Sequence, residues 1–104
     1  MTIDITFYRH FGPDILEGRK TITLRDQYES HFHAGQQLKA GYQDNQGYFA
    51  TLEVIGVTPV LWSQLTEEHA QQENMTLAEL KQVISGIYPG TEQLYMIRFR
   101  CLPE

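Results

Sequence analysis

An amine, a hydroxyl and two guanidinium groups lie close together near the start of the chain. They belong to the segment Gly18-Arg19-Lys20-Thr21-Ile22-Thr23-Leu24-Arg25-Asp26. A hydroxyl that gives its proton to a neighbouring base can attack an acyl carbon, so this segment could support acyl transfer. The same residues are also typical of a surface strand with solvated charges, and the pattern alone favours that interpretation.

Acyl transfer by this segment requires the Lys20 amine and the Thr23 hydroxyl to lie close together. In a strand over residues 20–25, side chains alternate between an apolar face and a polar face that carries Thr23 and Arg25. Strict alternation places positions 20 and 23 on opposite faces. Lys20 can therefore meet Thr23 only if it lies in the turn that leaves Gly18, or if a bulge separates the two residues.

Other kinds of site find less support. His31 and His33 could share a strand face, but no third ligand lies at metal-binding spacing, so a solvated loop is favoured. The residues after Gly18 lack the glycine spacing of a phosphate-binding loop, which disfavours nucleoside triphosphate hydrolysis. Cys101 has no evident activating neighbour and no second cysteine to pair with. We therefore expect no metal and no other cofactor.

Short strands and a few helices must position these groups. Alternating and β-branched segments predict strands over residues 2–7, 20–25, 37–42, 48–57 and 93–102. Gly12-Pro13-Asp14 predicts the start of a short helix that ends at Gly18. This order of elements predicts an α+β fold, a small mixed β-barrel with peripheral helices.

Two further helices are predicted between the last two strands. Trp62, Leu65 and His69 lie at helical spacing, with Ser63 as a possible cap. Thr76-Leu77-Ala78-Glu79 is a capping box that starts the second helix. The predicted buried stripe of that helix contains Leu77, Leu80, Val83, Ile84 and Ile87. Glu73 lies between the two helices, where an acidic residue usually does no more than favour a helix N-terminus.

Length and charge narrow the range of partners. A chain of 104 residues with 41% hydrophobic residues predicts a single domain over residues 1–104. The net charge is −5, and most of the acidic excess lies in residues 27–96. Because an acidic surface repels polyphosphate, we expect no extended binding of nucleic acid. The local basic cluster of Arg19, Lys20 and Arg25 could still bind a small ligand.

The chain also carries signals about its location. It has no basic N-terminal region followed by an apolar run, and no apolar stretch long enough to span a bilayer. With a single cysteine, these features predict a cytoplasmic protein without a membrane partner. No strand or helix shows a spare apolar face, so we expect a monomer.

The segment around Lys20 resembles a known signature. The pattern Gly18-x-Lys20-x-x-Thr23-x-Arg25 is similar to the G-x-K-x-x-E-x-R signature of ASCH domains, which are similar to PUA RNA-binding barrels. Thr23 stands where most of that superfamily carries Glu. A closer resemblance is to the small bacterial N4-acetylcytidine amidohydrolases. It rests on residues 4–7, 14–23, 29–32, 47–49, 72–77 and 87–90.

The resemblance implies a PUA-like (ASCH) barrel that removes the acetyl group from N4-acetylcytidine, a small nucleoside substrate, to give cytidine and acetate. It also implies that Thr23 is the nucleophile, Lys20 the proton acceptor and Glu73 the proton donor. A lysine that accepts a proton must be neutral, and burial and positive neighbours lower its pKa. Arg19 and Arg25 are the candidate neighbours and also the candidate substrate-binding residues.

Two other functions stay open. A non-catalytic RNA- or nucleoside-binding module would fit a PUA-like fold and the local basic cluster, although the acidic total charge argues against it. A protein-interaction module could instead use the acidic middle section to bind a basic partner. Candidate aromatic contacts for a cytosine ring are Phe7, Tyr8, Phe32 and Trp62. Cytidine release from N4-acetylcytidine would separate the enzyme from both alternatives.

Overall fold

The computed structural model describes residues 2–103, which form five strands and three α-helices. The strands are β1 (Ile5–Phe7), β2 (Ile22–Arg25), β3 (Gln37–Tyr42), β4 (Tyr48–Leu61) and β5 (Gln93–Cys101). The helices are α1 (Gly12–Leu16), α2 (Glu67–Gln72) and α3 (Leu77–Ile87). Three short 3₁₀ turns cover Arg9–Phe11, Gln27–Glu29 and Trp62–Gln64.

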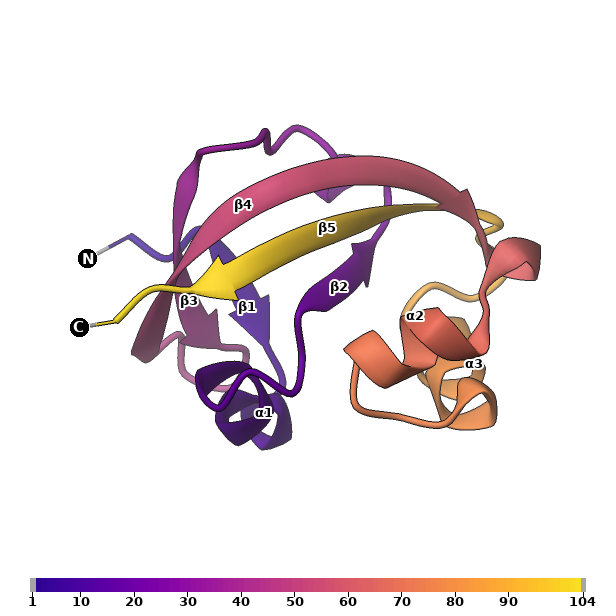
Figure 1. The fold of residues 1–104 in the computed structure, drawn as a ribbon, viewed down its shortest axis with the longest axis horizontal. Coiled ribbons are helices and arrows are strands. Elements are labelled where there is room, and N and C mark those ends of the chain that lie inside the picture. Colours follow the sequence, from indigo (N-terminus) through magenta and orange to yellow (C-terminus); the bar gives the residue numbers. More distant parts are fainter. Residues whose placement is uncertain (1, 104) are drawn as a thin grey trace.

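All five strands belong to one curved sheet in the order β1-β3-β4-β5-β2. β1 and β3 are parallel, and the other neighbouring strands are antiparallel. β4 and β5 are long and arch across the molecule (Figure 1). Register shifts at Ala40/Gly41 and Val54/Gly56 are typical of bulges, which bend strands. The sheet thus forms a half-barrel, and the predicted α+β class is confirmed.

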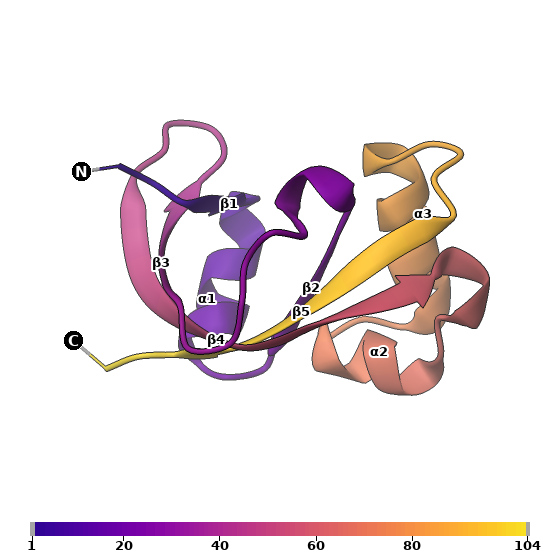
Figure 2. The ribbon, with the colours of Figure 1, turned by 90° about the horizontal axis from the view of Figure 1, so that it is seen from above.

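Helices lie at both ends of this half-barrel. α1 lies near β1 and β3, whereas α2 and α3 lie together near the other ends of β4 and β5 (Figures 1 and 2). One apolar cluster includes Ile15 of α1 and Phe99 of β5. A second cluster packs α2 and α3 against the sheet, and consists of Leu24, Leu65, Ala70, Leu80, Ile84 and Leu94. Met75 packs against both clusters and so joins the two ends of the core.

Several local predictions are confirmed. α1 begins at Gly12, and Gly18 has the left-handed φ of +79° expected after a helix end. The capping box of α3 is present, because Thr76 Oγ1 accepts from the Glu79 backbone N–H at 3.1 Å and Glu79 Oε1 accepts from Thr76 N–H at 3.0 Å. These signals depend only on neighbouring residues, which is why the sequence reveals them.

Other predictions require correction. Strand β4 continues to Leu61, beyond the predicted end at residue 57, because residues 57–61 pair with β5. Pro59 is tolerated there because the pairing of β4 with β3 ends at Glu53, which leaves the other edge of β4 free of a ladder. β1 and β2 are shorter than predicted and begin at Ile5 and Ile22.

The helical region after β4 also differs from the prediction. Trp62–Gln64 is a 3₁₀ turn, and α2 begins only after Thr66, whose N–H donates to His69 Nδ1 at 3.0 Å. Ser63 does not cap a helix, because its N–H and hydroxyl both donate to Glu92. The buried stripe of α3 is shorter than predicted, since Ile87 is 41% exposed.

Candidate active site

Lys20 lies in the turn between α1 and β2. The backbone N–H groups of Arg19 and Lys20 both donate to the carbonyl oxygen of Asp14, at 2.8 and 3.0 Å. The next residue, Thr21, donates its N–H to the carbonyl oxygen of Gln72 at the end of α2. Lys20 therefore precedes the regular strand, and this is the position that cooperation with Thr23 demands.

Thr23 lies within β2, opposite Ile97 of β5. Its side chain is not on the surface, since the residue is only 4% exposed, and Lys20 is only 3% exposed. The interpretation of this segment as a surface strand with solvated charges is therefore wrong at both positions. A buried hydroxyl and a buried amine need polar partners, because unpaired burial is costly.

Glu73 caps the C-terminus of α2 and is 3% exposed. The next residue, Asn74, has a left-handed φ of +57°, and its side chain donates to Asp14 Oδ1 at 3.2 Å. These contacts hold the break between α2 and α3 against the turn that carries Lys20. The Glu73 carboxylate consequently forms an ion pair with the Lys20 amine, which also donates to the carbonyl oxygen of Ile22 at 2.9 Å.

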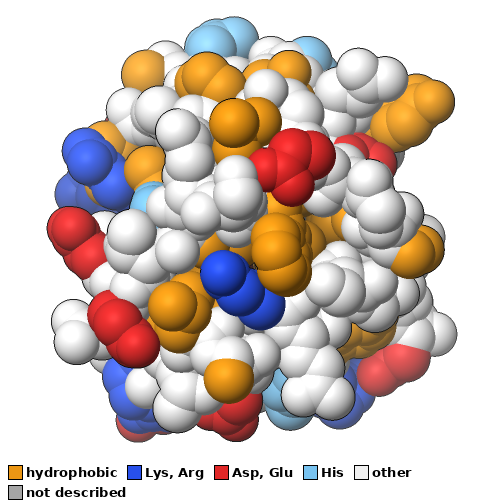
Figure 3. All heavy atoms as spheres, turned by 90° about the vertical axis from the view of Figure 1, so that its right-hand side faces the viewer, with side chains coloured by type: hydrophobic (Ala, Val, Ile, Leu, Met, Phe, Trp, Pro, Cys, Tyr) orange, Lys and Arg blue, Asp and Glu red, His pale blue; other side chains and the backbone are white. Residues whose placement is uncertain are grey.

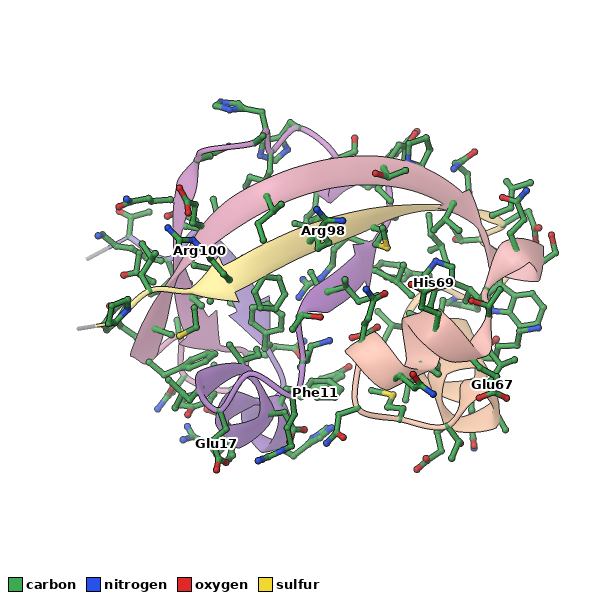
Figure 4. All side chains as sticks on the ribbon, viewed as in Figure 1. Phe11, Glu17, Glu67, His69, Arg98 and Arg100 are labelled. Atoms are coloured by element: carbon green, nitrogen blue, oxygen red, sulfur yellow. The ribbon has the colours of Figure 1, made fainter. Side chains whose placement is uncertain are left out.

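Lys20, Thr23 and Glu73 all line one cavity of about 200 Å³. One wall is aromatic and comes from the end of β1 and the segment that leads to α1, with Phe7, Tyr8 and Phe11. The opposite wall comes from α3 and its flanks, with Met75, Val83, Ile84, Ile87 and Tyr88. Figure 4 shows Phe11 between α1 and the α2–α3 pair. The cavity therefore encloses a few polar groups between two largely apolar walls.

The surroundings of Lys20 lower its pKa, so its amine loses a proton more readily than the amine of a surface lysine. Burial lowers its pKa well below the ordinary value, and the positive charge of Arg25 lowers it further, whereas Asp14 acts in the opposite direction. The Glu73 carboxylate favours the ammonium form through direct contact. A neutral amine beside a carboxylic acid holds as many protons as the ion pair, so the two groups titrate as one unit.

The two candidate arginines occupy different environments. The Arg25 side chain is 12% exposed and lines the cavity, where its Nε donates to Thr23 Oγ1 at 2.9 Å. Arg19 does not line this cavity, and its exposed guanidinium pairs with Asp14 and Glu17. Figure 4 shows Glu17 at the outer side of α1. The structure thus brings Arg25, but not Arg19, to the candidate site.

Of the four aromatic residues proposed to contact a cytosine ring, two line the cavity and two do not. Phe7 and Tyr8 line the cavity, whereas Phe32 belongs to the first apolar cluster. The Trp62 ring lies under the Lys81 amine, 4.7 Å from its centroid, and outside this cavity. The lining residues that sequence reasoning did not propose for the site include Phe11, Glu29 and Tyr88. Glu29 and Tyr88 lie in the segments 29–32 and 87–90 that carry the family resemblance, whereas Phe11 lies outside those segments.

Within residues 2–103, no three His, Cys, Asp or Glu side chains are grouped so that they could hold a metal ion. None of the helices in that range has the length and apolar character needed to cross a membrane. The arrangement that stands out chemically is a hydroxyl that lines the same cavity as a buried amine–carboxyl pair, and together these groups are the components of acyl transfer.

Comparison with known proteins identifies close relatives. The chain is 61% identical over 100 residues to the N(4)-acetylcytidine amidohydrolase of Cronobacter sakazakii, covering 96% of each chain. It is 57% identical over 99 residues to the protein of the same name from Escherichia coli, covering 95% of this chain and 96% of that one. No family model matches the sequence.

Solved structures show the same fold at much lower identity. An ASCH domain from Lactobacillus crispatus superimposes with a TM-score of 0.78 at 15% identity, covering 93% of this chain and 78% of that one. The ASCH protein from Zymomonas mobilis gives a TM-score of 0.69 at 13% identity, covering 92% and 64%. The fold is that of an ASCH domain, and the chain belongs to the N(4)-acetylcytidine amidohydrolase family.

Proposed function

We propose that this protein hydrolyses the acetyl amide of N4-acetylcytidine to cytidine and acetate. The observation that carries the proposal is the shared cavity, in which the Thr23 hydroxyl accompanies the buried Lys20–Glu73 pair. The names of the relatives at 57–61% identity support the choice of substrate. In the proposed assignment Thr23 is the nucleophile, Lys20 the proton acceptor and Glu73 the proton donor.

The first half-reaction transfers the acetyl group to the protein. Thr23 Oγ1 attacks the carbonyl carbon of the acetyl group while its proton passes to the neutral amine of Lys20. The carboxylic acid of Glu73 then protonates the N4 nitrogen, the C–N bond breaks, and cytidine leaves. Acetyl-Thr23 remains beside an ammonium–carboxylate pair, so every proton is accounted for.

The second half-reaction returns the site to its starting state. Water attacks the acetyl carbon of acetyl-Thr23 and loses one proton to the Glu73 carboxylate. The Lys20 ammonium returns a proton to Thr23 Oγ1 as the ester bond breaks, and acetic acid is released. Burial and the charge of Arg25, which both lower the pKa of Lys20, support this use of the amine as a base.

The dimensions of the site support a small nucleoside substrate. Pockets for drug-sized ligands measure about 300–1,000 Å³, and this cavity of about 200 Å³ suits an acylated base with the sugar at the mouth. Phe7 and Tyr8 offer aromatic contacts for the ring. The face that carries α2 and α3 shows acidic and basic side chains interspersed, without a continuous basic area (Figure 3). We therefore propose that extended nucleic acid is not the substrate.

We also propose a location and an oligomeric state for the protein. We place it in the cytoplasm, where a lone cysteine remains reduced, and we expect it to act as a monomer. Size-exclusion chromatography with light scattering tests the second expectation, and a stable dimer would contradict it.

The function is tested by incubating the purified protein with N4-acetylcytidine and following cytidine release by chromatography. Wild-type protein should release cytidine and acetate in equal amounts, and a folded Thr23→Ala variant should release neither above background. Binding of the nucleoside without product would instead favour a binding module. If the protein neither binds the nucleoside nor releases product, the protein-interaction function would be favoured.

A further inference from the structure

Arg25 uses its guanidinium almost wholly within the protein. Its Nε donates to Thr23 Oγ1 at 2.9 Å, and its two terminal nitrogens contact Glu29 and the Thr6 carbonyl oxygen. The contact with the Thr6 carbonyl oxygen measures 2.8 Å, and those with the two Glu29 carboxylate oxygens measure 3.0 and 3.2 Å. A side chain held on three sides in this way is better suited to fixing a neighbour than to following a mobile substrate.

The contact with Thr23 has a direction. A guanidinium can only donate hydrogen bonds, so Thr23 Oγ1 must be the acceptor in its bond with Arg25. The hydroxyl proton of Thr23 is then free to point elsewhere in the cavity, where the Lys20 amine is the candidate base. The positive charge beside Oγ1 also stabilises the negative charge that develops when the proton leaves.

Glu29 fixes the position of Arg25. It belongs to the 3₁₀ turn Gln27–Glu29, which begins where the Asp26 side chain accepts from the Tyr28 N–H at 3.1 Å. The guanidinium lies over the Phe7 ring, 4.9 Å from its centroid, and its charge favours that aromatic face. The carboxylate, the ring and the Thr6 carbonyl oxygen therefore hold the guanidinium in one orientation.

We propose that Glu29 is a positioning residue for hydrolysis, acting through Arg25 on the hydroxyl of Thr23. It holds Nε of Arg25 on the acceptor side of Oγ1, which leaves the hydroxyl proton directed toward Lys20. Arg25 is then a catalytic residue that touches the reacting oxygen, in place of the substrate-binding role expected for it. This inference rests on the proposed hydrolysis of N4-acetylcytidine.

If the Glu29–Arg25 ion pair served only to stabilise the fold around β2, its removal would affect stability and not catalysis. Losing a purely structural ion pair lowers the free energy of unfolding but leaves the turnover of the folded protein unchanged. Loss of positioning lowers kcat in the folded protein, because a misplacement of about 1 Å can reduce a rate about a hundredfold. KM should change little, since the contacts of the substrate with the cavity walls are retained.

The test compares kcat and KM for Glu29→Ala, Glu29→Asp and Glu29→Gln with those of wild type. Glu29→Ala should lower kcat about a hundredfold with KM within about threefold. Glu29→Asp keeps the charge but is too short to hold Arg25, and should lower kcat about tenfold. Glu29→Gln keeps an acceptor for Arg25 and should recover most of the activity lost in Glu29→Ala.

A matched control is Glu53→Ala, which removes the carboxylate of another Arg–Glu pair, with Arg100, outside the cavity. This variant should keep the wild-type kcat, and urea denaturation should show that each variant is folded under the assay conditions. Figure 4 shows Arg100 near the end of β5.

The outcomes separate this inference from the proposed function. An inactive wild-type protein would contradict the function itself. An active wild type together with wild-type kcat in Glu29→Ala would overturn only the role of Glu29. If Glu29→Ala does not fold, wild-type kcat in Glu29→Asp overturns it instead. A raised KM with unchanged kcat would assign Glu29 to substrate binding and would also contradict positioning.

Discussion

Replacing Glu73 by Gln removes the counter-charge of a buried amine while keeping the size of the side chain. Lys20 and Glu73 are each 3% exposed, and their charged groups are in contact. Removing one partner of a buried ion pair costs about 3–5 kcal/mol. Lys20 can limit this cost by losing its proton, but doing so at pH 7 instead of at its ordinary pKa of about 10.4 itself costs about 4–5 kcal/mol. Glu73→Gln should therefore lower the free energy of unfolding by about 3–5 kcal/mol near neutral pH.

The size of this loss should depend on pH. Burial and Arg25 already lower the pKa of Lys20, and removing the Glu73 charge lowers it further. Below that folded-state pKa, Lys20 is charged in both states and the full cost applies. Between it and about 10.4, the unfolded chain binds a proton that the native protein does not, so stability rises with pH. The deficit relative to wild type should shrink over this window.

Urea denaturation, followed by the fluorescence of the single tryptophan, measures this deficit at a series of pH values from neutral to alkaline. As a control, the double variant Lys20→Met, Glu73→Leu replaces the pair by apolar side chains and should recover most of the lost stability without activity. Wild-type stability of Glu73→Gln at neutral pH would show that the Lys20–Glu73 ion pair does not stabilise the fold. A deficit that stays constant or grows as the pH rises would contradict the expected loss of the Lys20 proton.

Three further variants test other parts of the structure. Lys20→Arg cannot accept a proton, so cytidine release should fall by at least about a hundredfold in a folded protein. Gly12→Ala should cost about 1–3 kcal/mol in urea denaturation, because its Cβ would lie 2.6 Å from the Tyr42 hydroxyl, whose ring is stacked on Phe49. Thr76→Ala should lower the unfolding free energy by about 1 kcal/mol through loss of the α3 cap, with unchanged kcat.

Local signals in the sequence predicted much of the fold. The capping box at Thr76, the helix that begins at Gly12 and the left-handed Gly18 depend on residues within one turn of each other, and all are found. Pairing between distant segments could not be predicted in this way. The extension of β4 to Leu61 depends on β5, more than thirty residues later in the chain.

In the candidate site, too, contacts between distant segments could not be predicted from local sequence patterns. That Lys20 meets Glu73 depends on the contact of Thr21 with the end of α2, and no periodicity in either segment indicates that contact. Only the resemblance to a known family placed the two residues in one site. The exposure of Ile87 was missed for a related reason, because an apolar stripe does not reveal that its last residue, Ile87, lines a cavity instead of packing into the core.

In the proposed reaction, the acetyl group passes through Thr23 on its way from the nucleoside to water. The most direct measurement is rapid quenching of wild-type protein with N4-acetylcytidine, followed by mass spectrometry of the intact chain and its peptides. We expect one added acetyl group on Thr23 that forms as fast as cytidine is released, and none on a folded Thr23→Val variant, which should also release no cytidine. Cytidine release at the wild-type rate by Thr23→Val, or an acetyl group found only on another residue, would contradict transfer through Thr23.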